Sequence, residues 1–207
     1  RSAAESGTVV SAGGGEYITS GGLDQGTTVA SGGSEHLSSG GIIQSATVLF
    51  GGQLYVSGSE SNSRILNGGT QTIYAGGKAA YTVLVGGSDV VSSGGIDSAT
   101  IISSGGSEYV YAGGMTSATT ILNGGIEYVS SGGTGSSATI SSGGLENVNS
   151  GGVAGGTTIS SGGREVVNSG GIANGVIVLS GAQLVVSGGT GSGVTVSNGG
   201  NEVLEVV

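Results

Sequence analysis

Pairs of glycine punctuate this chain of 207 residues at a nearly constant interval. One series begins at positions 13, 32, 51, 68, 86, 105, 124, 143, 162 and 199, and Gly181-Ala182 fills its one gap. A second series, at 21, 40, 76, 94, 113, 132, 151, 170 and 188, mostly follows eight residues after the first. Each unit of about 19 residues therefore divides into about 8 and 11. A self-similar period over nearly the whole chain is the signature of a repeat architecture.

The segments between the glycine pairs have the composition of β-strands. Gly105–Asn123, for example, reads GGSEYVYAGGMTSATTILN. Frequent glycine opposes helix, whereas Val, Ile, Thr and Tyr favour strands. The 49 glycines do not indicate disorder, because only 8% of residues are charged and the mean hydropathy is +0.26. The sequence predicts strands throughout.

The period predicts an all-β fold, a three-sided parallel β-helix of about ten rungs. A unit of this length is too short for a propeller blade and lacks a leucine ladder. One aliphatic column comprises Ile18, Leu37, Val56, Ile73, Val91, Val110, Val129, Val148, Val167, Val186 and Leu204. A second comprises Val29, Val48, Ile65, Val83, Ile102, Ile121, Ile140, Ile159, Val178 and Val196, and a third, with gaps, Leu23, Ile42, Ile96, Met115, Val153 and Ile172. We expect all three columns to point inward.

An acidic column lies two places before the first aliphatic one. Its members are Glu16, Glu35, Gln71, Asp89, Glu108, Glu127, Glu146, Glu165 and Glu202. Burying several charged carboxylates without cations is very costly, so we expect a bend that turns this column to solvent. The next place would then be an outward face, carrying Tyr17, Tyr55, Tyr109 and Tyr128, with His36 standing in for a tyrosine.

Composition and spacing argue against several function classes. Four basic residues against 13 acidic ones offer no nucleic-acid or anionic-lipid surface, and no apolar run is long enough for a membrane-spanning helix. The acidic column is too uniform for a catalytic pair, His36 lies in no nucleophile motif, and Asp24, Asp89 and Asp97 do not recur at a calcium-loop spacing. The sequence therefore indicates no catalytic residues, no metal site and no cofactor. A β-helical polysaccharide-degrading enzyme or depolymerase is the alternative; it would show a break in the acidic column.

The unit T-x-[IV]-x-S-G-G-x-[EQ]-x-[VI]-x-S-G-G, seen at 139–152 and 158–171, resembles the AIDA-type repeat of self-associating autotransporter adhesins, which include TibA-like glycosylated adhesins. The resemblance covers about 7–207. It implies a right-handed β-helix on the bacterial surface, exported through the outer membrane by a C-terminal translocator barrel. Residues 1–207 would then be a single passenger segment of a longer protein, without that barrel and not itself membrane-spanning.

The same resemblance implies adhesion, autoaggregation and biofilm formation. The implied partners are further copies of the chain, a host-cell surface receptor and a protein O-heptosyltransferase. The serines that match the family's Ser-Gly-Gly sites are Ser20, Ser31, Ser39, Ser93, Ser104, Ser131, Ser142, Ser150, Ser161, Ser169 and Ser187. The pattern departs at Gly58-Ser59, where a glycine is lost, and at 61–64, where we expect two residues to be missing.

Overall fold

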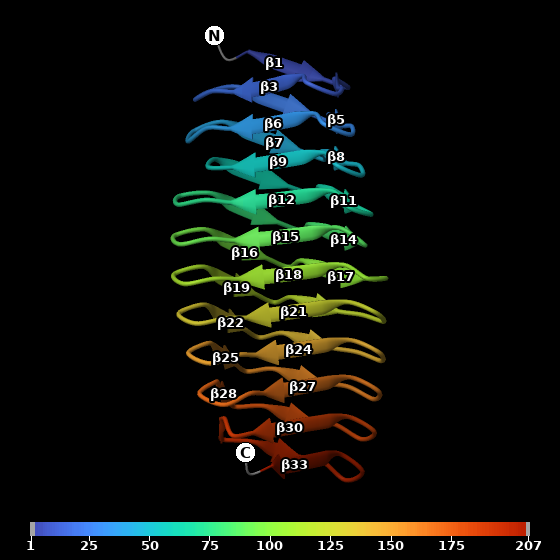
Figure 1. Ribbon diagram of the computed structural model, residues 1–207, viewed down its shortest axis with the longest axis vertical. Helices are drawn as coiled ribbons and strands as arrows, with labels where there is room; N and C mark the ends of the chain where they lie inside the picture. The colour runs from blue at the N-terminus through green and yellow to red at the C-terminus, as the bar shows by residue number, and fades with distance from the viewer. Residues whose placement is uncertain (1–2, 206–207) are drawn as a thin grey trace.

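The computed structural model describes residues 3–205 as a rod of stacked coils (Figure 1). The chain enters at one end of the rod and leaves at the other, and each coil contributes one strand to each of three parallel sheets of 11 strands. The β-solenoid expected from the glycine period is confirmed, with about 11 turns where the sequence predicted about ten rungs.

The strands are short and fall into three sets that repeat in chain order. Sheet A consists of β1 (Ala4–Ser6), β4 (Leu23–Gln25), β7 (Ile42–Gln44), β10 (Ser59–Ser61), β13 (Lys78–Ala80), β16 (Ile96–Ser98), β19 (Met115–Ser117), β22 (Thr134–Ser136), β25 (Val153–Gly155), β28 (Ile172–Asn174) and β31 (Thr190–Ser192). Sheet B consists of β2 (Val9–Val10), β5 (Thr28–Val29), β8 (Thr47–Val48), β11 (Arg64–Leu66), β14 (Val83–Val85), β17 (Ile101–Ser103), β20 (Thr120–Ile121), β23 (Thr139–Ile140), β26 (Thr158–Ile159), β29 (Ile177–Val178) and β32 (Thr195–Val196). Sheet C consists of β3 (Gly15–Ile18), β6 (Ser34–Leu37), β9 (Gln53–Val56), β12 (Thr70–Ile73), β15 (Ser88–Val91), β18 (Ser107–Val110), β21 (Ile126–Val129), β24 (Leu145–Val148), β27 (Arg164–Val167), β30 (Gln183–Ser187) and β33 (Asn201–Glu205).

Equivalent residues of successive repeats lie beside each other in these sheets. Glu127 of β21, for example, pairs with Glu146 of β24. Every place in the repeat therefore becomes a column along the rod, with neighbours about 4.8 Å apart.

Two of the three expected inward columns are confirmed. The first aliphatic column is buried on sheet C and the second on sheet B, apart from members in the end coils; in the second column the inward residue of β14 is Leu84, one place after the expected Val83. Together their side chains form one continuous aliphatic core along the rod.

The third column is wrong: its members point outward from sheet A. Ile42 is 43% exposed and Met115 is 46% exposed, because the sheet A strands have three residues and only the middle one faces in. The inward places are held by the following residues, such as Ile43 and Ala154, and also by the acids Asp24 and Asp97.

The acidic column is also not where the sequence predicted, because it lies inside the rod. Sheet C alternates without a bend, so the second and fourth residue of each strand face the core. Seven members are fully buried, namely Glu35, Gln71, Asp89, Glu108, Glu127, Glu146 and Glu165. Only Glu16 and Glu202, in the end coils, are partly or fully exposed.

Each glycine pair meets two separate demands of the corner. In the pair that follows β24, Gly151 has a φ of 74°, where other residues are strained. Its neighbour Gly152 lies so close to the previous coil that an added Cβ would be 2.3 Å from the Val129 carbonyl oxygen. One glycine makes the turn and the other lets the coils stack.

Two residues are missing from one corner, and they are not missing where the sequence suggested. Ser57 aligns with Ser38 and Ser59 with Ile42, so a single residue, Gly58, spans a corner that takes three in the coil before. The segment 61–64, by contrast, keeps the full register of its neighbour. The deletion shortens the loop and leaves the strands intact.

Candidate functional surface

The matching serines gather at the loop tips of two corners. Six follow sheet C (Ser20, Ser39, Ser93, Ser131, Ser150 and Ser169) and four follow sheet B (Ser31, Ser104, Ser142 and Ser161), and all ten are exposed. Ser187 differs, because its corner is one residue short and it aligns with Asn168 at the strand end, where it is half-buried. The serines thus form two rows along the rod with one outlier.

The tip serines are open for modification. Within residues 3–205 no hydrogen bond joins any of the ten tip hydroxyls to a protein atom. Most of them stand over the first glycine of the next coil; a Cβ at Gly151, for example, would lie 2.7 Å from Ser131 Oγ. The glycine that makes one turn therefore also leaves space for the serine of the turn before.

One further tip serine was not identified from the sequence, because it lacks the Ser-Gly-Gly motif. Ser180 occupies the same corner place as Ser161 and is exposed. Its motif reads Ser-Gly-Ala, because Ala182 stands where the second glycine normally does. The 19-residue spacing from Ser161, and not the dipeptide, is the signal that identifies it.

The enclosed carboxyls form a polar seam inside the core. Thr116 donates to Glu127 at 2.7 Å, Thr119 to Glu108 at 3.2 Å and Thr157 to Glu146 at 3.1 Å. Several oxygens of the seam, among them both Oε atoms of Glu165, have no hydrogen-bond partner among residues 3–205. Such groups are costly to ionise in place.

Burial sets the protonation of this seam. It raises the pKa of Glu35 to about 9, with a further contribution from Asp24, and raises the pKa of Glu165 to about 8, helped by Glu127. The pKa of Glu60 rises to about 7, again through burial, although the hydrogen bonds from Ser63 oppose the rise. The sequence made the burial of charged carboxylates implausible. In the structure these carboxyls are buried, and their raised pKa values mean that they keep their protons.

Two acidic groups approach closely enough to share a cation as well as protons. The ligand oxygens of Glu16, Asp24 and Glu35 lie within 4.8 Å of one another, as do those of Asp89, Asp97 and Glu108. The second group has essentially no exposed surface. A glycan cannot reach Asp89, Asp97 and Glu108 in the folded rod, so these three carboxyls do not supply the acid–base pair that a polysaccharide-degrading enzyme needs.

The outward aromatic column is confirmed and includes the histidine. The His36 ring lies 4.8 Å from that of Tyr17 and 4.7 Å from that of Tyr55, and the rings of Tyr109 and Tyr128 lie 5.1 Å apart. His36 Nε2 is 3.2 Å from Ser34 Oγ, while the adjacent Glu35 points into the core. His36 therefore stands in for a tyrosine of the column.

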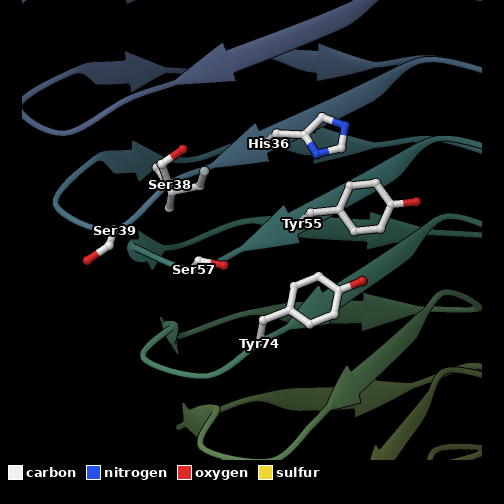
Figure 2. A pocket seen from close by; sticks show the side chains of 7 residues that line it. His36, Ser38, Ser39, Tyr55, Ser57 and Tyr74 are labelled. Atoms are coloured by element: carbon white, nitrogen blue, oxygen red, sulfur yellow. The ribbon is translucent and has the colours of Figure 1, made fainter.

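A hollow of about 520 Å³ opens beside the shortened corner. Its lining comprises His36, Leu37, Ser38, Ser39, Tyr55, Ser57 and Tyr74. Figure 2 shows the rings of Tyr55 and Tyr74 next to each other on the outer face, with the serines at the loop side.

Comparison with known proteins finds a similar solved structure. No helix among residues 3–205 has the length and apolar character needed to cross a membrane. No protein-family model matches the chain, and no curated protein does. Among solved structures, it is similar to the crystal structure of a TibC-catalyzed, hyper-glycosylated TibA fragment. The TM-score is 0.77 at 33% sequence identity, over 99% of this chain and 92% of that one.

Proposed function

The chain belongs to the family of TibA-like β-helical passengers, and from this premise we propose that it is a glycosylated adhesin segment displayed on the bacterial surface. The observation that carries the proposal is the placement of the serines. Ten of the eleven matching serines stand exposed at corner tips, in a solenoid similar to that of a hyper-glycosylated fragment. The rod acts as a scaffold that presents sugars in rows.

The modifying partner would be a protein O-heptosyltransferase that acts on corner serines. Neighbouring tips such as Ser131, Ser150 and Ser169 are about one coil spacing, about 4.8 Å, apart along the rod. The enzyme meets the same turn with the same free hydroxyl at each step. We therefore expect modification to follow the rows and to spare serines on the strands.

Co-expression of the chain with such a transferase, followed by intact mass and peptide mapping, tests this. We expect additions of heptose mass on Ser131 and Ser150 peptides, and their loss in Ser131→Ala and Ser150→Ala. The matched control is Ser98, whose Oγ donates to the Ala79 carbonyl at 3.3 Å and which should stay unmodified. Additions on Ser98 in place of the tips, or an unmodified mass, would contradict the proposal.

Adhesion, autoaggregation and biofilm formation follow from display of the rod at the cell surface. Its partners would be copies of itself on other cells and a host-cell surface receptor. Settling of cells that display the chain, compared with cells that display a scrambled-repeat control, measures the effect. Equal settling of the two would refute the aggregating role and leave the glycosylation result standing.

A further inference from the structure

The shortened corner after β9 removes one loop tip from the row that follows sheet C. Ser38-Ser39-Gly40-Gly41 turns the coil before it and Tyr74-Ala75-Gly76-Gly77 the coil after it, whereas only Gly58 separates Ser57 from Ser59. The two flanking tips are therefore about two coil spacings apart, or about 9.6 Å. The gap adjoins the hollow of about 520 Å³. Figure 2 labels six of the side chains that line this hollow.

The gap leaves one backbone donor and one backbone acceptor without partners. At regular corners the tip N–H donates to the next coil, as from Gly21 to the Gly40 carbonyl at 2.8 Å and from Gly76 to the Gly94 carbonyl at 3.0 Å. The missing tip breaks this chain of bonds. Within residues 3–205, the Gly40 N–H finds no backbone acceptor and the Gly76 carbonyl receives no backbone donor. By the geometry of the repeat, both groups face the gap.

The side chains around the gap combine aromatic rings with hydroxyls. The rings of Tyr55 and Tyr74 have centroids 6.1 Å apart and planes inclined by 24°, so they form a nearly continuous aromatic floor. Ser38, Ser39 and Ser57 add hydroxyls at the loop side (Figure 2). No carboxylate, ammonium or guanidinium group lines the hollow.

We propose that this hollow binds a neutral pyranose sugar, seated between the two flanking tips with one face on Tyr55 and Tyr74. A sugar ring has an apolar face of C–H groups and a rim of hydroxyls that both donate and accept. The aromatic floor matches the face, while Ser38, Ser39 and Ser57 match the rim. The unpaired Gly40 N–H and Gly76 carbonyl border the adjoining gap. A lining without carboxylate, ammonium or guanidinium groups favours a neutral ligand over an ionic one.

The shallow site predicts weak binding to one sugar unit, with Kd on the order of a millimolar. Repetition along displayed rods would raise the apparent affinity for a many-branched surface glycan. The sugar could belong to a foreign glycan or to a modified serine of another copy of this chain, because both present a neutral ring.

The site would give the proposed adhesin a ligand, yet its test is independent of that role. Unglycosylated chain is titrated with methyl glycosides of glucose, galactose and mannose, and binding is followed by ligand-observed NMR. A second arm replaces the glycosides with the chain obtained by co-expression with the transferase. Failure of binding leaves surface display and glycosylation untouched, and failure of cell settling leaves this result untouched.

The repeat supplies an unusually close control for the key ring. Tyr111-Ala112-Gly113-Gly114 has the same sequence as the Tyr74 corner, and Tyr111 is exposed to a similar extent, 47% against 43%. The Tyr111 corner, however, lies next to complete corners on both sides. We expect Tyr74→Ala to weaken binding at least about 10-fold and Tyr111→Ala to leave it unchanged.

A second variant fills the gap without removing any side chain. Inserting Ser-Gly after Ser57 produces Val-Ser-Ser-Gly-Gly-Ser, which matches the regular corner Val-Ser-Ser-Gly-Gly-Thr at 129–134. The filled corner should fold at least as stably as the parent, measured by its unfolding midpoint, and should lose binding in both arms. The proposal is overturned if the filled variant binds like the parent or if neither arm shows binding.

Discussion

Replacing Glu165 by glutamine removes one ionisable group from the enclosed seam and keeps nearly the same size and shape. Neither Oε of Glu165 has a hydrogen-bond partner, so the change breaks no bond of the folded rod. Burial, followed by the charge of Glu127, raises the pKa of Glu165 from 4.5 to about 8. The folded rod thus holds this proton more tightly than the unfolded chain does. Its contribution to stability is complete below pH 4.5 and is lost as the pH rises through about 8.

The size of the effect follows from the two pKa values. The difference between 4.5 and about 8 is about 3.5, and each pKa unit corresponds to about 1.4 kcal/mol, giving at most about 5 kcal/mol. Glu127 titrates with its neighbour, and its own pKa is raised to about 7 by burial, so the pair shares part of this energy. We expect Glu165→Gln to raise the free energy of unfolding by about 2 to 5 kcal/mol at pH 9 and by very little at pH 4.

Denaturant unfolding followed by far-UV circular dichroism measures the effect at pH 4, 7 and 9. EDTA is included because the enclosed acidic groups could otherwise be neutralised by a divalent cation. The control is Glu202→Gln, which changes an exposed member of the same column. The parent should unfold at lower denaturant concentrations as the pH rises, and this decrease should be smaller for Glu165→Gln. A parent that is more stable at pH 9 than at pH 4, or equal pH slopes for the parent and Glu165→Gln, would refute the reasoning.

Two further predictions concern the core and the corners. Ile140→Asp should lower the unfolding midpoint far more than Tyr128→Asp, because Ile140 is fully buried and an unpaired charge there costs several kcal/mol; equal losses would contradict the assigned facing. Gly152→Ala should destabilise the rod by more than about 1 kcal/mol, since its Cβ would meet the Val129 carbonyl oxygen, whereas Gly155→Ala, with open space around it, should be nearly neutral in the same melting assay.

The sequence predicts the architecture well because every coil of a solenoid repeats the same local sequence pattern. Glycine pairs mark the corners, and columns such as the one through Ile121, Ile140 and Ile159 identify two inward faces without reference to distant residues. The third face could not be found in this way. Its strands have three residues, and an apolar outer residue such as Ile172 precedes a small inner one, Ala173. Hydrophobicity alone then selects the wrong side.

The shortened corner shows a second limit of predicting structure from the spacing of glycine pairs. The sequence shows that two residues are missing between Gly51 and Gly68, but both 57–58 and 61–64 could contain the deletion. Hydrogen-bond register decides the matter, since Arg64 still pairs with Thr47 and Ser59 with Ile42. The hollow therefore becomes visible only when neighbouring coils are compared in space.

The prediction that the acidic column faces solvent was wrong because it assumed that each carboxyl is ionised. In a stacked repeat, burying one acid at a given place means burying a ladder of them about 4.8 Å apart, and such a ladder cannot be fully charged. Keeping the protons resolves the conflict and leaves the period-2 alternation of sheet C unbroken. At pH 7 at least Glu35, with a pKa of about 9, and Glu165, with a pKa of about 8, stay neutral. The folded rod therefore carries less negative charge at pH 7 than its formal net charge of −9, and the buried acids contribute nothing directly to its solvent-facing surface. If rods associate as proposed, the outward tyrosines, the corner serines and any sugars on those serines would therefore make the contacts.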